Sequence, residues 1–351
     1  MKVLLLNQMH RKTGIGSYIE TMENSFISMD IDYKIITLAY DNQVENYYGD
    51  VYQGFNFPIK KEYINAVFSQ IIYRHVVNKI KEYKNDGYII HYGSNSMTPI
   101  TNYDIVTLHD DGFRESYANA PAYKYFASYY GYFFILKKFL KFPYMIVLIE
   151  VMKEKLLKKY NYKGKIYVVP HYYSPIFKPL GDKISIRKEL KLPANKILIL
   201  SVSTDKHNKN LEIILKVISM LGNKYKLIRV GPKIGDSITF NNVDYITLNK
   251  LYNACDMLIE PSLNEGFGYP LIEAFATGLP VVCSNIPVFH EIGGDASVFI
   301  NNNDPKDIVR GINEVLNNIT YYKKKSIERS KLFTLQEFSK KMINVYRDIN
   351  W

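Results

Sequence analysis

Glu265 and Glu273 lie eight residues apart in the part of this sequence that is best suited to chemistry, PSLNEGFGYPLIEAFATGLPVVCSN at residues 261–285. The apolar run at residues 257–260 predicts a strand, and residues 261–269 predict the loop that follows it. A helix is expected to begin at Pro270, because proline fits best at the first helical position. The two carboxylates therefore belong to one strand-loop-helix unit and are expected to face one pocket.

The same unit predicts an anion site. The first N–H groups of a helix have no partner within the helix, and Gly266 and Gly268 allow a ligand to approach the backbone closely. This combination suits a diphosphate. A carboxylate beside it accepts hydrogen bonds from two sugar hydroxyls well, because it offers only acceptors in a fixed fork. The alternative is that Glu273 only stabilises the helix dipole and that Glu265 is solvated.

Lys209 lies in SVSTDKHNKNLEIIL, residues 201–215, between a predicted strand at residues 196–202 and a predicted helix at residues 211–221. Ligands of parallel α/β sheets bind at the carboxyl ends of the strands, which is where this lysine is expected. Its ammonium group would offset the charge that builds on a departing diphosphate. A solvated surface lysine is the alternative.

A glycine-containing turn, TGIGSY at residues 13–18, follows the first predicted strand. Gly14 and Gly16 permit close approach of a ligand, and a helix from Ser17 would offer its N-terminus to that ligand. A dinucleotide fingerprint needs a third glycine, and Ile19 stands in that place, so the fingerprint is incomplete. A tight turn between strand and helix is the alternative.

His109 ends the strand predicted at residues 105–109, within VTLHDDG. A functional side chain at this end of a strand would face a ligand. Asp110 and Asp111 are adjacent and form no D-x-D motif, and no further ligand stands at metal spacing. We therefore expect no metal site and no cofactor. A hydrogen-bonded structural histidine is the alternative for His109.

Short β-branched runs alternate with helical patterns along the chain. Continuous apolar strands separated by amphipathic helices are typical of parallel sheets covered on both faces, and two series of strands predict an α/β protein with two Rossmann-like domains. The predicted strands span residues 2–7, 33–39, 88–92, 105–109, 145–149 and 166–170, and then residues 196–202, 226–230, 243–246, 257–260, 280–284 and 297–300. The predicted helices include residues 15–29, 151–160, 211–221 and 270–277.

A chain of 351 residues is too long for one ordinary core and suits two domains. The stretch HYYSPIFKPLGD, residues 171–182, contains Pro175, Pro179 and Gly181 and has little helical periodicity, which predicts a linker. We expect a first domain at residues 1–172 and a second at residues 173–330. A C-terminal helix at residues 331–351 is expected to return to the first domain.

Residues 249–303, which begin NKLYNACDMLIEPSLNEGFGYPLIEAFATGLPVVCSNIPVFHEIGGDAS, resemble the signature of family 4 of the retaining glycosyltransferases, which have the GT-B fold. The family's two glutamates separated by seven residues fall on Glu265 and Glu273. The resemblance is strong over about residues 196–305 and collinear elsewhere. It implies that Glu273 binds the ribose of a nucleotide and that Glu265 contacts the transferred sugar.

The resemblance also implies that Lys209 binds phosphate and that His109 contacts the donor sugar. Many family members have an arginine where this chain has Ser203, and Lys206 is a candidate to replace it. The implied catalytic residues are Glu265, His109 and Lys209. The implied donor-binding residues, several of which act through their backbone, are Gly14, Gly16, Lys206, Gly266, Phe267, Gly268, Tyr269, Leu271 and Glu273.

These features predict a glycosyltransferase that moves a hexose from a nucleotide diphosphate sugar, held by the second domain, to a sugar or lipid-linked acceptor. The first domain would hold the acceptor across an interdomain cleft. The resemblance implies retention of the anomeric configuration, and positioning and electrostatics are expected to carry the reaction without a metal ion. A nucleotide-sugar epimerase or phosphorylase on the same fold, and a non-catalytic nucleotide-sugar-binding module, are the alternatives.

The net charge of +11, from 45 basic and 34 acidic residues, calls for an anionic partner. The lysines are scattered and no nucleic-acid-binding signature is present, so phosphorylated small molecules are favoured over nucleic acid. Residues 123–144 interleave aromatic side chains with Lys137, Lys138 and Lys141. This pattern fits either core packing with a solvated edge or peripheral contact with an anionic membrane.

No apolar run is long enough to span a membrane, and the apolar start of the chain is too short for a signal peptide. Cys255 and Cys283 stand in apolar surroundings without metal-ligand spacing, which favours buried thiols. We expect a cytoplasmic protein, and any peripheral contact with a membrane would be at its inner face.

Overall fold

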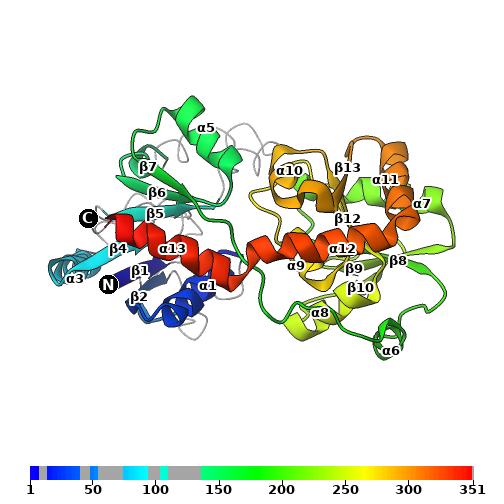
Figure 1. The fold of residues 1–351 in the computed structure, drawn as a ribbon, viewed down its shortest axis with the longest axis horizontal. Helices are drawn as coiled ribbons and strands as arrows, with labels where there is room; N and C mark the ends of the chain where they lie inside the picture. The colour runs from blue at the N-terminus through cyan, green and yellow to red at the C-terminus, as the bar shows by residue number, and fades with distance from the viewer. Residues whose placement is uncertain (8–13, 40–47, 54–73, 94–102, 110–135, 350–351) are drawn as a thin grey trace. The chain divides into compact units, whose positions relative to one another are not determined.

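The structure is a computed structural model that describes residues 1–7, 14–39, 48–53, 74–93, 103–109 and 136–349. The chain forms two compact units. Unit 1 consists of Met1–His171 together with Leu335–Trp351, and unit 2 consists of Tyr172–Thr334. Each unit contains a parallel sheet with helices packed on it, and each is described by itself (Figure 1).

The sheet of unit 1 has seven strands in the described residues, in the order β3-β2-β1-β4-β5-β6-β7. Every pair in this sheet that the structure describes is parallel. The strands are β1 (Lys2–Asn7), β2 (Asp32–Ala39), β3 (Asp50–Gln53), β4 (Tyr88–Tyr92), β5 (Ile105–Leu108), β6 (Tyr144–Val147) and β7 (Lys165–Val168). The strand order reverses between β1 and β4, which is the topological switch point of this sheet.

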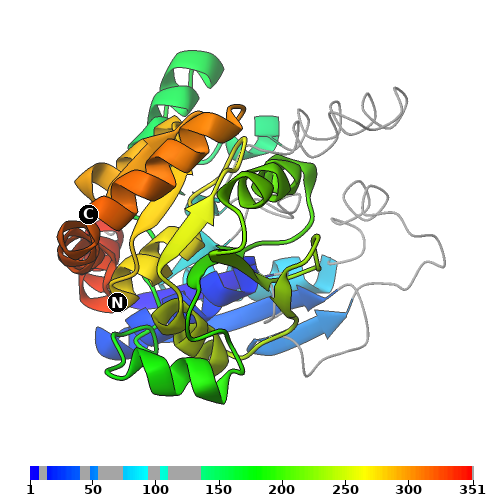
Figure 2. The same cartoon turned by 90° about the vertical axis from the view of Figure 1, so that its right-hand side faces the viewer.

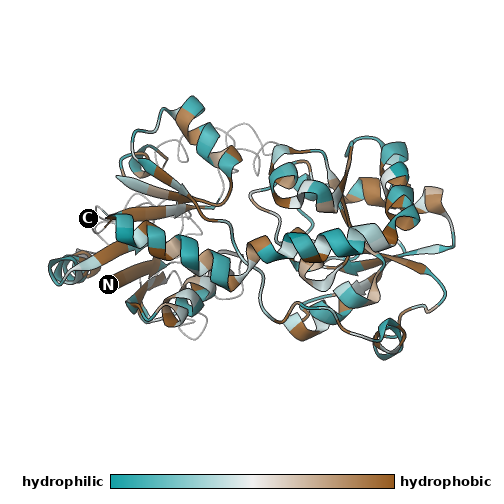
Figure 3. Ribbon diagram, viewed as in Figure 1, coloured by the Kyte–Doolittle hydropathy of each residue, from teal (hydrophilic) through white to brown (hydrophobic). Residues whose placement is uncertain are grey.

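The strands of unit 1 are short apolar runs that suit a sheet covered on both faces. The side chains of residues 3–7 in β1 are all buried, as are those of β5. Figure 3 shows these strands mostly in the hydrophobic colour, whereas the helices carry both colours. The labelled helices of unit 1 are α1 (Gly14–Ser28), α3 (Arg74–Asn85), α5 (Glu150–Tyr160) and α13 (Leu335–Ile349).

Helix α13 packs in unit 1 although it follows all of unit 2 along the chain. The hydroxyl oxygens of Ser25 on α1 and Ser339 on α13 lie 2.9 Å apart. The rings of Phe26 and Tyr346 pack with their centroids 6.0 Å apart. The hydroxyl of Tyr346 lies 2.5 Å from Nδ1 of His91 on β4. Both ends of the chain therefore build the core of this unit.

The sheet of unit 2 has, in the part of the chain that is described, six parallel strands in the order β10-β9-β8-β11-β12-β13. Its switch point lies between β8 and β11. The strands are β8 (Ile197–Val202), β9 (Tyr225–Val230), β10 (Ile238–Phe240), β11 (Met257–Glu260), β12 (Val281–Ser284) and β13 (Ser297–Ile300). The α-helices are α6 (Lys183–Glu189), α7 (Leu211–Leu221), α8 (Tyr245–Ala254), α9 (Tyr269–Thr277), α10 (Pro287–Gly293), α11 (Pro305–Asn317) and α12 (Ile319–Ser330).

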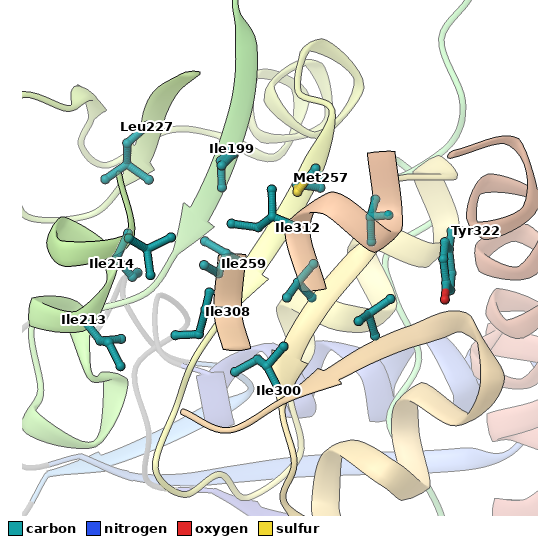
Figure 4. Close-up of a cluster of buried hydrophobic side chains, with 14 residues drawn as sticks. Ile199, Ile213, Ile214, Leu227, Met257, Ile259, Ile300, Ile308, Ile312 and Tyr322 are labelled. Atoms are coloured by element: carbon teal, nitrogen blue, oxygen red, sulfur yellow. The ribbon is translucent and has the colours of Figure 1, made fainter. Parts of the chain in front are cut away.

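One face of the unit 2 sheet packs against α7 and α11. Met257 and Ile259 of β11 lie in an apolar cluster with Ile214 of α7 and Ile308 of α11, all buried (Figure 4). Since side chains alternate along a strand, Glu260 at the end of β11 belongs to the other face. Helices α8 and α9 contact each other and the strands β8 and β12, and Figure 2 shows helices on both sides of the sheet.

The predicted α/β architecture with two parallel sheets is confirmed, but the strand predicted at residues 243–246 is wrong. Asp244 instead caps α8, where its carboxylate accepts a hydrogen bond of 2.7 Å from the N–H of Thr247. The buried Leu248, Leu251 and Tyr252 follow at helical spacing. The sixth strand of the sheet is β10, and β3 of unit 1 is a further strand that the sequence analysis missed.

Candidate functional site

The switch point of unit 2 brings together the two loops that carry Lys209 and Glu265. Strands β8 and β11 are neighbours in the sheet. Lys209 ends the short 3₁₀ helix η3 (His207–Lys209) that follows β8, and Glu265 lies in the loop that follows β11. Ligands of parallel α/β sheets bind at this place, outside the carboxyl ends of the strands where the strand order reverses.

Asparagine side chains tie these two loops to each other. Asn208 accepts a backbone hydrogen bond of 2.8 Å from Leu263, and its side-chain amide donates to the carbonyl of Asn264 at 3.1 Å. The amide of Asn210 donates to the carbonyl of Asn302 at 2.7 Å. The amide of Asn302 donates to the carbonyl of Ser262 at 3.0 Å. Lys209 is thus held opposite the loop of Glu265 by hydrogen bonds that do not involve either charge.

Lys209 and Glu265 form an ion pair. Their side chains are only 16% and 13% exposed, so water screens the pair weakly. Oε1 of Glu265 also lies 2.7 Å from Oγ of Ser262. Burial acts to lower the pKa of Lys209, but the carboxylates of Glu260 and Glu265 outweigh it and raise that pKa above its ordinary value. Lys209 is therefore a fixed positive charge in the site.

Helix α9 begins at Tyr269, one residue before the predicted start, so that Pro270 is its second residue and Glu273 lies in its second turn. Gly268 caps the helix with φ of 105°, and a Cβ atom there would approach Phe289 to 3.0 Å, so a side chain at this position would be both strained and crowded. The N–H of Leu271 donates to the carbonyl of Gly268 at 3.0 Å. Of the backbone groups predicted to bind the donor, the N–H of Leu271 is already used by this turn.

Around that turn, Phe267 and Gly268 are buried, and Gly266 and Tyr269 are half-buried. The rings of Phe267 and Tyr269 pack edge to face with centroids 5.7 Å apart. The rings of Phe267 and Tyr269 therefore pack on each other at the start of α9.

Glu273 is half-buried and is held by Tyr252, a residue that the sequence analysis did not single out. The hydroxyl of Tyr252 donates a hydrogen bond of 2.7 Å to Oε2 of Glu273. Burial raises the pKa of Glu273 to about 7, and the hydrogen bond opposes this shift. Tyr252 lies in α8, 21 residues before Glu273, and in the sequence it looks like any buried helical aromatic.

The cation nearest to Ser203 comes from β9. The guanidinium group of Arg229 donates to the carbonyls of Ser203 and Thr204, the latter at 3.1 Å, and to that of Ser201 at 3.2 Å. Arg229 is fully buried, whereas Lys206, the predicted replacement, is exposed at the start of η3. Positive charge behind Ser203 is thus supplied by a residue that the sequence analysis took for an ordinary strand position.

In unit 1, His109 follows β5 and is buried. Its Nε2 lies 2.8 Å from the carbonyl oxygen of Gly93 and must donate, because a carbonyl only accepts. The ring packs edge to face on Tyr18 and stacks on His171, with centroids 4.7 and 5.5 Å apart. Burial lowers the pKa of His109 to about 4, so the imidazole is neutral near pH 7. These contacts match the structural alternative for His109, and its role at the donor sugar stays a prediction.

His91 on β4 belongs to the same buried network. Its Nε2 lies 2.8 Å from the hydroxyl of Thr107, and that hydroxyl lies 2.9 Å from the phenol oxygen of Tyr18. Burial, and to a smaller degree His109, lowers the pKa of His91 to about 3. His91 was not predicted, because a histidine inside an apolar strand gives no signal of its partners.

The remaining predicted residues of unit 1 are only partly described. Gly14 and Gly16 lie in the first turn of α1, which begins one residue before the helix predicted at residues 15–29. They are therefore helical rather than part of a loop. Asp110 and Asp111 lie outside the described residues, as do residues 123–135 of the aromatic and lysine-rich stretch.

Two features are absent from the described residues. These residues contain no cluster of three or more histidine, cysteine, aspartate or glutamate side chains placed to hold a metal ion. They also contain no helix with the length and apolar character needed to cross a membrane. Cys255 and Cys283 are buried free thiols.

Residues 182–331 match the family model of glycosyl transferases group 1. The matched segment includes Lys209, Glu265 and Glu273. The O-antigen chain mannosyltransferase RfbU of Salmonella typhimurium is 28% identical over 203 residues, which cover 51% of this chain and 55% of that protein. The chain thus spans about half the length of this relative.

Solved structures match the chain over nearly its whole length. Sucrose-phosphate synthase from Thermosynechococcus elongatus superposes with a TM-score of 0.80 at 17% identity, covering 99% of both chains. HepE from Anabaena, in complex with UDP and glucose, superposes with a TM-score of 0.72 at 13% identity, covering 99% of this chain and 100% of that one. At such identities the likeness shows the fold alone. The chain has the GT-B fold, and its residues 182–331 are similar to the glycosyl transferases group 1.

Proposed function

We propose that this chain is a retaining, metal-independent glycosyltransferase that moves a hexose from a nucleotide diphosphate sugar to an acceptor hydroxyl. The observation that carries the proposal is that Lys209 and Glu265 form an ion pair at the switch point of unit 2. The N-terminus of α9, with Glu273 in its second turn, belongs to the same loop region. A cation, two carboxylates and a helix N-terminus are the groups that a diphosphate attached to two sugars requires.

In the proposed reaction, the bond between the anomeric carbon and the β-phosphate oxygen breaks, and its electron pair leaves with the diphosphate. The acceptor oxygen bonds to the same face of the anomeric carbon, and its proton passes to the departing phosphate. Lys209 and the N-terminus of α9 stabilise the charge that builds on the diphosphate. Glu265 orients the sugar, and Glu273 holds the ribose.

The relatives narrow the choice of substrates. RfbU is named for the transfer of mannose in the O-antigen chain, which supports a hexose donor and a glycan or lipid-linked glycan acceptor. HepE holds UDP and glucose, which supports a nucleoside diphosphate in unit 2 of this chain.

The proposal is tested by incubating the protein with UDP-glucose or GDP-mannose, with and without a mixture of glycan acceptors, and by measuring released nucleoside diphosphate and new glycoside. A transferase releases the diphosphate in step with the glycoside. An epimerase changes the sugar without any acceptor, and a phosphorylase requires inorganic phosphate. A binding module raises its melting temperature with UDP or GDP but turns over neither donor. Each of these last three results would contradict the proposal.

A further inference from the structure

A second carboxyl group lies next to the Lys209–Glu265 pair and has no part in the proposed reaction. Glu260, the last residue of β11, is only 2% exposed. Its Oε1 lies 2.6 Å from Oγ of Ser262. Its Oε2 is buried and has no hydrogen-bond partner among the described residues. Burying a carboxylate in this way is costly unless the group is neutral or paired.

The Ser262 hydroxyl indicates where a proton lies. Its oxygen is within hydrogen-bond distance of two carboxyl oxygens, Oε1 of Glu260 at 2.6 Å and Oε1 of Glu265 at 2.7 Å. A hydroxyl has one proton to donate, so both contacts are hydrogen bonds only if one carboxyl group is itself protonated. Glu265 faces the ammonium group of Lys209, which favours its ionised form. The proton therefore belongs on Glu260, which donates to Ser262, and Ser262 donates to Glu265.

The environment of Glu260 agrees with this assignment. Burial raises its pKa to about 7, and Glu265 raises it further, while Lys209, Ser262 and Arg229 oppose the shift. Two other titratable groups face Glu260, Tyr252 from α8 and Cys283 from β12. Burial raises the pKa of both, so both stay neutral in the range where Glu260 titrates.

The protonation of Glu260 changes the charge of the site by one unit. With Glu260 protonated, it adds no negative charge beside Lys209 and Arg229, both of which interact with it. With Glu260 ionised, one more negative charge lies there, and the single proton of the Ser262 hydroxyl is shared between two carboxylates. The diphosphate of a donor is a multiply charged anion, so it binds more tightly to the first state.

We propose that Glu260 is a positioning residue of the diphosphate site. Its neutral carboxyl group directs the Ser262 hydroxyl to Glu265 and adds no negative charge beside Lys209, where the donor binds. This inference rests on the proposed function, because it takes the diphosphate to bind beside Lys209. In this proposal Glu260, which is buried, acts through Ser262 and not by contact with the donor.

The test measures the dissociation constants of UDP and GDP for wild type and Glu260→Gln at about pH 6 and about pH 8.5. The glutamine side chain keeps a neutral donor toward Ser262 at both values. Titration of the nucleotide's own phosphate is common to both proteins and cancels in their ratio. We expect wild type to bind as tightly as Glu260→Gln near pH 6 and about tenfold more weakly near pH 8.5, since a linked pKa shift of one unit corresponds to a factor of about ten.

Glu328→Gln is the matched control, because Glu328 is an exposed residue of the same unit. The ratio of its dissociation constant to that of wild type should not change with pH. If the same ratio for Glu260→Gln is also constant, the role of Glu260 is overturned and the proposed function stays in place. Absence of UDP and GDP binding to wild type at both pH values would overturn the diphosphate site, and this inference with it.

A second measurement does not need Glu260→Gln and tests the proposal even if that variant does not fold. Titration calorimetry of wild type near pH 8, in buffers of different ionisation enthalpy, gives the protons taken up on binding of UDP or GDP. At this pH the free nucleotide diphosphate is fully ionised, so uptake must come from the protein. We expect uptake of a fraction of one proton. Because Glu273 also has a pKa of about 7, Glu273→Gln is measured beside wild type. Zero uptake in both proteins would contradict a titrating Glu260.

Discussion

The ammonium group of Lys209 pairs with the carboxylate of Glu265 across 56 residues of sequence, at the carboxyl ends of two adjacent strands. In this pair the lysine has a partner before any donor binds. In the proposed reaction, a diphosphate would share Lys209 with Glu265, and the sugar would bring hydroxyl groups to the carboxylate in return. The pair would then place the charge that assists departure beside the group that orients the sugar.

Lys209→Ala should reduce turnover by roughly 10²–10³, the usual effect of removing a preorganised charge contact to a developing anion. The melting temperature of the variant tests whether the fold is intact, and steady-state kinetics give the rate. Lys206→Ala is the matched control and should turn over near the wild-type rate, because Lys206 is exposed. Equal losses in the two variants would mean that Lys206 shares the work, and no loss in Lys209→Ala would place the phosphate site elsewhere.

Glu273→Ala should weaken the binding of free UDP or GDP by roughly 1–3 kcal/mol, the usual loss when a hydrogen bond to a charged group is removed. Glu265→Ala should weaken it less, because Glu265 is assigned to the sugar, which the free nucleotide lacks. Titration calorimetry of both variants measures the difference. If wild type and Glu273→Ala bind UDP or GDP with equal affinity, Glu273 does not bind the ribose.

Tyr252→Phe should weaken nucleotide binding by less than Glu273→Ala does. The variant keeps the ring packing of Tyr252 but loses its hydrogen bond of 2.7 Å to Glu273, so the carboxylate stays present but is less well oriented. Since this hydrogen bond lowers the pKa of Glu273, its loss should also move the pH dependence of binding to higher pH. A variant with wild-type affinity and an unchanged pH profile would show that Tyr252 only fills space.

Activity should survive chelation by EDTA with little change, since Lys209 and the N-terminus of α9 are proposed to stabilise the leaving diphosphate. Initial rates with and without EDTA, and after addition of magnesium or manganese, check this. Loss of activity on chelation and its return with either metal would contradict metal-independent transfer.

The two units should respond to acid in opposite directions. The folded-state pKa values of His91 and His109, about 3 and about 4, lie below the ordinary 6.5. Unfolded unit 1 therefore binds more protons between about pH 4 and 6.5, and its free energy of unfolding falls as the pH drops, by up to about 1.4 kcal/mol per histidine and pH unit. Glu260 has a pKa of about 7 instead of the ordinary 4.5, so folded unit 2 binds more protons than unfolded unit 2 between about pH 4.5 and 7. In this range its free energy of unfolding therefore rises as the pH drops.

Hydrogen exchange at about pH 5 and about pH 7.5, corrected for intrinsic rates, would compare peptides from β4 and β5 with peptides from β11. Protection in β4 and β5 should fall at the lower pH relative to protection in β11. A parallel change in both units would show that other groups dominate.

Much of the fold follows from local sequence. The bounds of β1, β4, β11 and β13 agree with the predicted strands, because each is a continuous apolar run that a turn or polar residue ends. The edge strands β3 and β10 were missed or misplaced, since short edge strands carry little apolar signal. Val243, Tyr245 and Ile246 are β-branched or aromatic and favour a strand, but the cap at Asp244 and the burial of one helical face decide the structure of this segment.

For the candidate site, too, the sequence indicates some residues and not others. Glu265, Glu273 and Lys209 could be found because they stand in motifs of fixed spacing. Three supporting features could not be found in this way: Tyr252, which bonds to Glu273, Arg229, which bonds to the backbone at Ser203 and Thr204, and the asparagines that tie the loops together. They meet these loops only through the order of strands in the sheet. Sequence spacing says nothing about which loop the side chain of a strand or helix residue will meet.

The position of α13 sets an order of assembly on the chain as it is synthesised. Residues 1–171 belong to unit 1. However, its buried contacts from His91 to Tyr346 and from Ser25 to Ser339 need residues that are translated after Thr334. Unit 2 is continuous and can close its core as soon as its own residues have left the ribosome. The usual order, in which the N-terminal domain finishes first, is therefore reversed here, and the nascent protein holds a complete unit 2 while unit 1 still waits for its last helix.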